Sequence, residues 1–267
     1  MQTTTAADGT RIAYDRTGTG APLVLLHGGG GHEFWDPLRP GFADSYTVYA
    51  PDRRGVGESG DAETYAIERE VADARAVIDE TDGDPVVFGH SFGGLQALEA
   101  AQEADVAGVV AYEPAYLVGE YRETADLAAR MQARIDEGDR RGAMKLHLRE
   151  VLNGDAYEDF DAFLAEWPGW PDAAESVEGA QRMDRALETH HPPDALDLDV
   201  PVLLLTGTRG PPHLRDSVRA VRDALPDARL VEFDGLGHLG PVEDPDRVAE
   251  AVRTFLTETV AHDPAEN

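Results

Sequence analysis

A serine lies in a short glycine-rich segment between an apolar run and a helical pattern. The run Pro85–Phe88 leads into GHSFG at residues 89–93, which matches G-x-S-x-G, and the helical pattern covers Leu95–Ala104. Glycines on both sides permit a sharp turn that exposes the oxygen of Ser91 at the carboxyl end of a strand. Free N–H groups at the start of the helix favour negative charge that develops beside it. The pattern therefore predicts that Ser91 is a nucleophile, and its context disfavours the alternative of a plain turn that contains a serine.

The elements that must position this serine follow a strand–helix alternation. Apolar runs bounded by turn residues are typical of strands buried on both faces. Such runs cover 22–26, 46–50, 85–88, 106–112, 201–205 and 229–233, and helical patterns cover 66–80, 95–104, 216–225 and 246–259. Residues 3–6 and 10–14 are compatible with an antiparallel hairpin at one edge. The alternation predicts an α/β fold with a mostly parallel central sheet flanked by helices.

Residues 115–195 interrupt this alternation. Helical patterns cover 125–137, 142–152, 156–166 and 173–188, with WPGWP at 167–171 as an interruption and no strong strand signal. An all-helical insert between two sheet strands indicates a cap over the ligand-binding edge. We therefore expect a core formed by 1–114 and 196–262, a helical cap at 115–195 inserted between the sixth and seventh core strands, and a flexible tail at 263–267.

Four motifs in this order resemble those of the α/β-hydrolase family. They are HGG at 27–29, DRRGVGES at 52–59, GHSFG at 89–93 and GH at 237–238, and together they span nearly the whole chain. The resemblance implies an α/β-hydrolase fold and an oxyanion hole made by the backbone N–H groups of Gly29 and Phe92. It also implies that His238 is the general base, a role that requires a neutral imidazole near the serine hydroxyl.

The chain departs from the family pattern at the acid. Family members commonly carry an aspartate just beyond the strand equivalent to 201–205, but the segment TGTRGPP at 206–212 has no carboxylate and places Arg209 there. A guanidinium has no acceptor for the imidazole N–H. Glu113 directly follows the neighbouring strand and is the alternative acid. The competing interpretation is that Glu113 lines the pocket or pairs with Arg209, which would leave an incomplete triad.

Several residues near these motifs are expected to have supporting roles. His27 and the DRRG segment at 52–55 are expected to be structural, and His32, His90, Phe34 and Trp35 are candidates for packing against the site or lining it. The pair His190 and His191 is expected to be solvated. No His/Asp/Glu group shows ligand spacing on one element, so the sequence predicts neither a metal site nor a cofactor.

The composition limits the environment and the partners. The 267 residues carry a net charge of −29, and Lys145 is the only lysine. This excess of carboxylates with few lysines is typical of proteins adapted to a salty cytoplasm, where short Debye lengths screen self-repulsion. The acidity disfavours nucleic acid and anionic membranes as partners. The absence of cysteine excludes disulfides and thiolate chemistry. With no apolar run of membrane-spanning length and no signal pattern, the expected location is the cytoplasm.

These features predict a cofactor-free serine hydrolase that cleaves a small-molecule ester or similar acyl compound through an acyl-enzyme intermediate. Dehalogenase and epoxide-hydrolase chemistry is disfavoured, because those relatives need an aspartate where this chain has Ser91. Perhydrolysis or a lyase reaction on the same triad stays open. The alternative from another class is a non-catalytic binder or sensor that has lost the acid, and the feature that favours it is Arg209.

Overall fold

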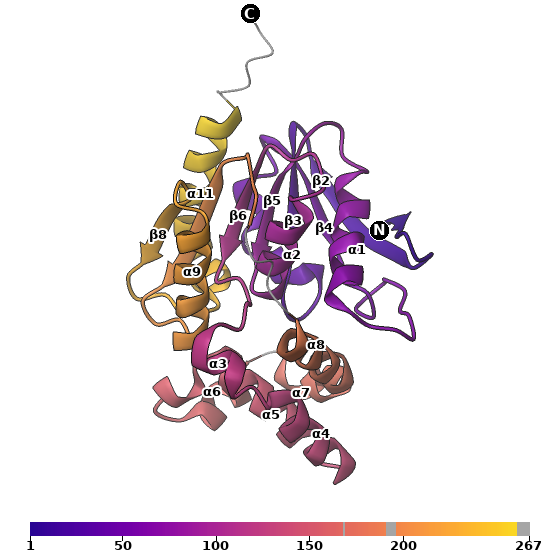
Figure 1. The fold of residues 1–267 in the computed structure, drawn as a ribbon, viewed down its shortest axis with the longest axis vertical. Coiled ribbons are helices and arrows are strands. Elements are labelled where there is room, and N and C mark those ends of the chain that lie inside the picture. Colours follow the sequence, from indigo (N-terminus) through magenta and orange to yellow (C-terminus); the bar gives the residue numbers. More distant parts are fainter. Residues whose placement is uncertain (168, 191–195, 261–267) are drawn as a thin grey trace, which may run out of the picture.

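The computed structural model describes residues 1–167, 169–190 and 196–260. An eight-stranded sheet forms its centre, in the order β1-β2-β4-β3-β5-β6-β7-β8 (Figure 1). The strands are β1 (Gln2–Thr5), β2 (Arg11–Gly18), β3 (Ala21–Leu26), β4 (Tyr46–Pro51), β5 (Val86–His90), β6 (Gly108–Tyr112), β7 (Val202–Gly207) and β8 (Arg229–Phe233). β1 and β2 pair antiparallel at one edge, and every pairing from β3–β4 to β7–β8 is parallel. The α/β-hydrolase fold expected from the sequence is confirmed.

Alternating side chains of the central strands pack into two hydrophobic layers. On β3, Val24 and Leu26 face a cluster that includes residues of α1, α2 and α9, whereas Leu23 and Leu25 face a cluster that includes residues of α11. Successive side chains of a strand point to opposite faces, so a continuous apolar run is required where both faces are covered. The helices of these layers are α1 (Ile67–Ile78), α2 (Phe92–Ala100), α9 (Pro212–Ala224) and α11 (Pro245–Val260), with a short α10 (Gly240–Glu243) before α11.

The segment between β6 and β7 forms a helical cap at one end of the sheet, at the bottom of Figure 1. Its helices are α3 (Gly119–Glu123), α4 (Leu127–Asp136), α5 (Arg140–Val151), α6 (Phe160–Glu166), α7 (Trp170–Ala173) and α8 (Val177–Thr189). Helices α4 to α8 share a separate hydrophobic cluster that includes Met131, Leu148 and Phe160. The Lys145 ammonium on α5 pairs with the Asp161 carboxylate on α6. The cap therefore has its own core beside that of the sheet.

Some element boundaries differ from the expectations. Helix α3 was not expected, and the single helix expected over 173–188 is divided by a 3-10 turn at Ala174–Ser176. Helix α9 begins at Pro212 rather than Asp216, because a proline fits the first helical turn, where its missing N–H needs no partner. The expected flexible tail lies outside the described residues, as do His191 and Pro168.

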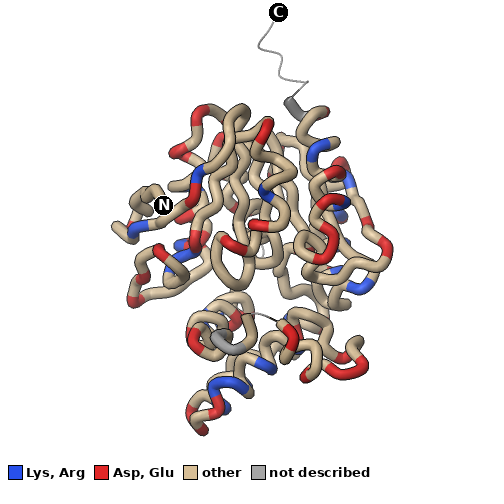
Figure 2. Tube along the Cα trace, turned by 180° about the vertical axis from the view of Figure 1, so that it is seen from behind, with Lys and Arg blue, Asp and Glu red and all other residues tan. Residues whose placement is uncertain are grey.

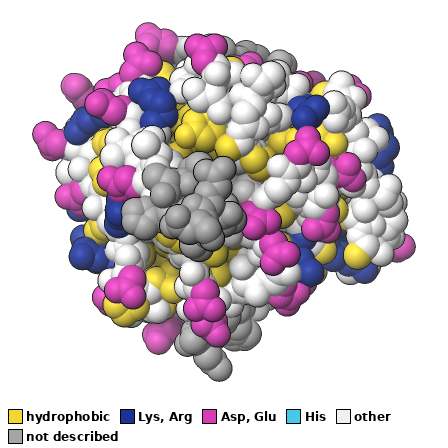
Figure 3. Space-filling model, turned by 90° about the horizontal axis from the view of Figure 1, so that it is seen from above, with side chains coloured by type: hydrophobic (Ala, Val, Ile, Leu, Met, Phe, Trp, Pro, Cys, Tyr) yellow, Lys and Arg dark blue, Asp and Glu magenta, His cyan; other side chains and the backbone are white. Residues whose placement is uncertain are grey.

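The surface is polar and rich in acidic groups. Acidic residues outnumber basic ones along the trace (Figure 2), and at the end away from the cap both kinds surround small apolar patches (Figure 3). Among the described residues, the exposed large hydrophobic side chains are Met1, Tyr121 and Val242. No helix in the described ranges is both long and apolar enough to cross a membrane.

Candidate active site

Ser91 occupies a strained turn between β5 and α2. Its φ and ψ are 57° and −118°, and a side chain rarely adopts a positive φ. The turn is so tight that a Cβ on Gly89 would lie 2.0 Å from the carbonyl oxygen of Gly93. A Cβ on Gly93 would lie 2.0 Å from the carbonyl oxygen of Leu26. Only glycine fits at positions 89 and 93, which explains the spacing of the motif in physical terms.

The strand ends fix the backbone of this turn. The N–H of Ser91 donates to the carbonyl oxygen of Tyr112 on β6 at 2.9 Å. The carbonyl of Ser91 accepts from the N–H groups of Gly94 at 2.9 Å and Ala115 at 3.1 Å. The bonds with Tyr112 and Ala115 join the turn to the end of β6 and to the segment that follows it. The strain at Ser91 is therefore held by the neighbouring strand.

His238 and Glu113 form a buried hydrogen-bonded pair at the same edge of the sheet. The imidazole Nδ1 of His238 lies 2.7 Å from Oε2 of Glu113, and the two side chains are 4% and 0% exposed. A carboxylate can only accept, so the proton of a neutral imidazole is on Nδ1. Nε2 then has a free lone pair, which is the form that a general base requires.

The loop after β7 holds Glu113 instead of supplying an acid. Oε1 of Glu113 accepts from Thr206 Oγ1 at 2.8 Å and from the N–H of Gly207 at 3.2 Å. A Cβ on Gly210 would lie 1.9 Å from the same Oε1, so a glycine is needed beside the carboxylate of Glu113. Arg209 is exposed, and its Nη1 donates to the carbonyl oxygen of Gly235 at 3.2 Å. The partner of Glu113 is thus His238, and Arg209 points to the neighbouring loop.

Tyr112 and His90 support the backbone around His238. The hydroxyl of Tyr112 donates to the carbonyl oxygen of Gly237 at 2.7 Å, and Nε2 of His90 donates to the carbonyl oxygen of His238 at 2.7 Å. The rings of His90 and His238 are 4.5 Å apart between centroids, and Phe34 stacks on His90 at the same separation. Burial, with the nearby His238, holds the pKa of His90 well below its ordinary value. His90 is therefore a neutral packing group against the His238 ring.

The first glycine loop lies directly against the serine turn. A Cβ on Gly28 would be 2.8 Å from Cβ of Ser91 and 3.3 Å from the amide nitrogen of Phe92. Among the described residues, the backbone hydrogen bonds of turns and loops include none that the N–H of Gly29 or of Phe92 donates. Two N–H groups that lie beside a serine can donate hydrogen bonds to the negatively charged oxygen of a tetrahedral intermediate and so stabilise it.

Comparison with known proteins agrees with this architecture. The model of the alpha/beta hydrolase family matches residues 23–251. The chain belongs to the alpha/beta hydrolase family. The match extends from β3 to α11, so it includes the cap and all of the motif residues described above.

Relatives of this hydrolase span its whole length. It is 31% identical over 271 residues to a Mycobacterium tuberculosis protein named "Putative non-heme bromoperoxidase BpoC", covering 94% of this chain and 99% of the relative. The crystal structure of an alpha/beta hydrolase from Sphaerobacter thermophilus has 32% identity and a TM-score of 0.82, over 96% of this chain and 100% of that one. An esterase from Exiguobacterium antarcticum, 20% identical, has a TM-score of 0.81 over 96% and 99% and shows the shared fold.

One group in the described part of the hydrolase has the geometry to hold a metal ion. Ligand atoms of His32, Glu33 and Asp52 all lie within 4.8 Å of one another, although the sequence indicated no such group. However, Asp52 Oδ1 accepts from the backbone N–H of His32 at 2.9 Å and from its Nδ1 at 2.8 Å, and Oδ2 accepts from the N–H of Glu58 at 2.9 Å. These bonds give Asp52 a structural role, joining the glycine loop to the 52–59 loop.

Two other histidines of the hydrolase have surroundings that the sequence did not indicate. His190 was expected to be solvated, but its side chain is 10% exposed and Nε2 donates to Glu99 at 2.7 Å, because the segment after α8 packs against α2. His213, at the start of α9, has a pKa lowered to about 4, first by burial and then by the nearby His238. Only long-range packing brings these groups to their partners, so local sequence patterns cannot reveal them.

Proposed function

We propose that this hydrolase cleaves esters or similar acyl compounds with Ser91 as nucleophile, His238 as general base and Glu113 as the acid of the triad. The observation that carries the proposal is the 2.7 Å hydrogen bond between the buried pair His238 and Glu113, at the strand ends beside the Ser91 turn. The names of its relatives support the same class of chemistry, since they include an esterase and a lipase.

The proposed reaction follows from the proton positions. Nε2 of His238 takes the proton of the Ser91 hydroxyl as the serine oxygen attacks the acyl carbon. The N–H groups of Gly29 and Phe92 receive the resulting oxyanion, and His238 returns the proton to the departing alcohol. Water then attacks the acyl-enzyme and gives its proton to His238. The bond between the acyl carbon and the Ser91 oxygen breaks, the acid leaves, and His238 returns the proton to the Ser91 oxygen. Glu113 keeps the imidazole oriented and stabilises its charged form throughout.

Hydrogen peroxide could replace water in the second step. The acyl-enzyme would then yield a peracid and free Ser91, with His238 taking the peroxide proton. The bromoperoxidase name of the relative at 31% identity favours testing this second reaction. Acyl-enzyme formation is common to both reactions, so they differ only in the attacking nucleophile.

The competing proposal is a binder or sensor that lacks the acid. It depended on Arg209 standing at the usual acid position. The contact of Glu113 with His238 provides the missing acceptor from β6, and Arg209 bonds elsewhere. The geometry therefore favours an enzyme over a binder.

A fluorophosphonate probe tests the proposal, because it reacts covalently with an activated serine. We expect stoichiometric labelling of the wild type and turnover of p-nitrophenyl esters, both measured in ~2 M KCl where the acidic surface is screened. Ser91→Ala should abolish labelling and lower ester turnover by several orders of magnitude without changing the fold. Ser45→Ala is the control, because Ser45 is an exposed serine in the turn before β4.

Two outcomes would contradict the proposal. Folded wild-type protein that resists the probe and hydrolyses no ester would favour the binder. Residual turnover of the Ser91→Ala variant above ~1% of wild type would exclude Ser91 as nucleophile. Addition of peroxide to the same assay, with detection of peracid, distinguishes perhydrolysis from hydrolysis.

A further inference from the structure

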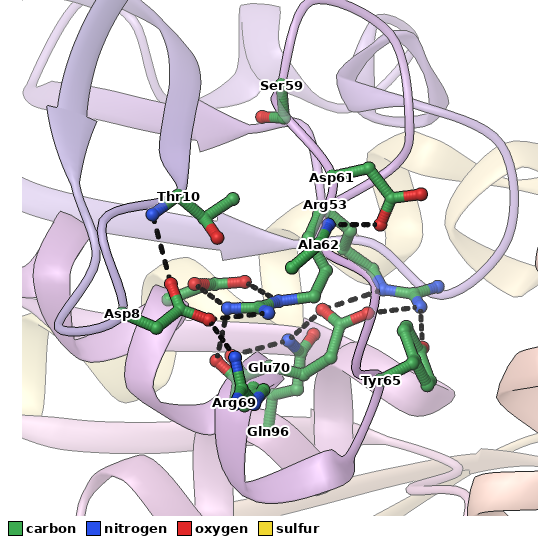
Figure 4. Close-up of polar contacts among 12 residues, drawn as sticks. Asp8, Thr10, Arg53, Ser59, Asp61, Ala62, Tyr65, Arg69, Glu70 and Gln96 are labelled. Atoms are coloured by element: carbon green, nitrogen blue, oxygen red, sulfur yellow. Dashed lines mark hydrogen bonds and ion pairs between the residues drawn. The ribbon is translucent and has the colours of Figure 1, made fainter.

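Two adjacent arginines, Arg53 and Arg54, are buried beside the site and pair with carboxylates on α1. Arg53 is 9% exposed and donates to Glu70 through Nη2 at 2.7 Å (Figure 4), and Arg54 is 1% exposed and donates to Asp73 through Nε at 2.6 Å. Buried ion pairs contribute little net stability, because desolvation offsets their attraction. Both pairs fit a structural role, but only the first has further contacts toward Ser91.

The guanidinium of Arg53 contacts the Gly28–Gly29 peptide and the side chain of Phe92, the two parts of the proposed oxyanion hole. Nη1 donates to the carbonyl oxygen of Gly28 at 2.6 Å. The guanidinium carbon also lies 4.2 Å from the centre of the Phe92 ring, the side chain of the residue after the serine. The side-chain hydrogen bonds of Arg54 are to Asp73, Asp8 and the carbonyl oxygen of Arg69, and among the described residues none is to either segment.

The bond to Gly28 acts on the N–H of Gly29, because both groups belong to one planar trans peptide. In such a unit the carbonyl and the N–H point in opposite directions. Anchoring the Gly28 oxygen on Arg53 therefore fixes the direction of the Gly29 N–H. A charge-assisted bond to the oxygen also polarises the peptide, which makes its N–H a stronger donor. Glycines flank this peptide, so the backbone itself supplies little rigidity.

Arg53 is held firmly enough for this task. Glu70 is 0% exposed and is itself held by Gln96, whose Nε2 donates to Oε2 of Glu70 at 3.1 Å. Nη2 of Arg53 also donates to the Tyr65 hydroxyl at 2.7 Å (Figure 4). The Glu70 carboxylate and the Tyr65 hydroxyl thus hold the Nε and Nη2 side of the guanidinium, and Nη1 points to the carbonyl oxygen of Gly28.

We propose that Arg53 is a positioning residue that orients and polarises the Gly28–Gly29 peptide of the oxyanion hole and packs on Phe92, the second donor residue. The proposal rests on the serine hydrolase function proposed above. The expected consequence of losing Arg53 is poorer stabilisation of the tetrahedral intermediate with little change in substrate binding.

The test compares two matched double variants. Arg53→Gln with Glu70→Gln removes the guanidinium without leaving a buried unpaired carboxylate, and Arg54→Gln with Asp73→Asn does the same for the neighbouring pair. Each is assayed for kcat and KM on a p-nitrophenyl ester and for affinity toward a trifluoromethyl ketone, whose adduct with serine places an oxyanion in the hole. Thermal unfolding reports the fold of each variant.

We expect the Arg53/Glu70 variant to lose ~10–100-fold in kcat, less than the ~10²–10³ of deleting a donor outright. Its KM should stay within about threefold of wild type, and its ketone affinity should fall by the same factor as kcat/KM. The Arg54/Asp73 variant should keep the wild-type kcat and ketone affinity. Equal losses in both variants, or an unchanged ketone affinity in the first, would overturn the proposal.

Arg53→Lys keeps the proposal testable if the double variant does not fold. Its single ammonium can pair with Glu70 and so preserve the buried charge balance, but it lacks the fork that also reaches Gly28. A loss of kcat and ketone affinity at constant KM supports the proposal, and wild-type values in the folded variant refute it. Failure of wild-type labelling by fluorophosphonate would instead count against the proposed function itself, so the two failures can be told apart.

Discussion

The carboxylate of Glu113 reaches the imidazole of His238 from the residue that directly follows β6. The residue follows β6, and its φ of 44° turns the side chain toward the loop that follows β8. Parallel strands end at one edge of the sheet, so a residue after β6 and one after β7 approach the same imidazole. The glycine at 210 leaves the space that the glutamate fills.

The Glu113→Gln variant tests this role. The amide cannot stabilise an imidazolium and can hold the wrong tautomer, so turnover should fall by ~10²–10⁴ while the fold and KM are kept. The measurement is kcat and KM of the purified variant. Glu243→Gln is the matched control, because Glu243 accepts the N–H of Gly237 at 2.9 Å beside the base.

A near-wild-type turnover of Glu113→Gln would mean that Glu113 only lines the pocket. A second carboxylate offers a further check, since Arg209→Asp restores the family's usual acid position. If Glu113 orients His238, this change should recover part of the turnover lost in Glu113→Gln. No recovery would show that the loop after β7 cannot present an acid to the imidazole.

The candidate site was predictable only in part, for reasons visible at single residues. The turn at Ser91 is compact. A Cβ on Gly89 would clash with the backbone of Gly93, and a Cβ on Gly93 with the backbone of Leu26 on the neighbouring strand β3, so a short glycine motif specifies the turn. The contact of Glu113 with His238 joins positions 125 residues apart, and the sequence left it open against pairing with Arg209. The bond of Arg53 to Gly28 depends on the loop path after β4 and had no sequence signal.

At the scale of elements, a buried ion pair joins two helices of the cap. Nδ1 of His147 on α5 lies 2.8 Å from Oδ2 of Asp184 on α8, and the side chains are 8% and 5% exposed. Burial lowers the pKa of His147, but the ion pair with Asp184 outweighs burial and raises the net pKa above its ordinary value. The charged pair is therefore favoured in the folded cap.

This raised pKa predicts a loss of stability at alkaline pH. A histidine whose pKa is higher in the folded state contributes its full stabilisation below the unfolded value of about 6.5, and the contribution is lost as pH rises through the folded pKa. The free energy of unfolding should therefore fall as the pH rises from about 6.5 through the raised pKa of His147 in the folded state. The double variant His147→Gln with Asp184→Asn should flatten this slope, and an unchanged slope would assign it to other groups. Urea titrations at a series of pH values measure the free energy of unfolding and its slope with pH.

The elements themselves were largely predictable because their signals are local. Six apolar runs became β3 to β8, since strands covered on both faces require continuous apolar sequence. Helix α3 was missed, because its five residues are too few for a periodic apolar pattern and none of them is buried. The start of α2 was placed late, because the glycines at 93 and 94 weaken the local helical propensity that the turn geometry overrides.

At the scale of the whole molecule, the surface charge dominates. The chain has 52 acidic residues against 23 basic ones, and many of the ion pairs among the described residues are between exposed groups. Exposed pairs contribute ~0–1 kcal/mol each, so they do not offset the repulsion of the remaining carboxylates. Salt is expected to act on this repulsion, since it shortens the Debye length from ~10 Å at 0.1 M to ~3 Å at 1 M.

The thermal unfolding midpoint should therefore rise with salt, by on the order of 10 °C between dilute buffer and ~2 M KCl. Calorimetry or circular dichroism at several KCl concentrations measures the change. Sucrose at matched osmolality is the control, because it favours the compact state without screening charge. A flat or falling midpoint in KCl would contradict the proposed adaptation to salt and leave the proposed chemistry intact.

The lone lysine has a practical consequence for observing the cap. Lys145 lies on α5, its side chain is 34% exposed, and apart from the α-amine it is the only primary amine of the chain. An amine-reactive dye used at alkaline pH would thus mark the cap at one internal position without any engineered cysteine. The other two tryptophans, Trp167 and Trp170, lie in the cap, so replacing both with phenylalanine leaves Trp35, which is buried in the core, as the energy donor. Energy transfer from Trp35 to the dye would then report any movement of the cap when an acyl ligand enters.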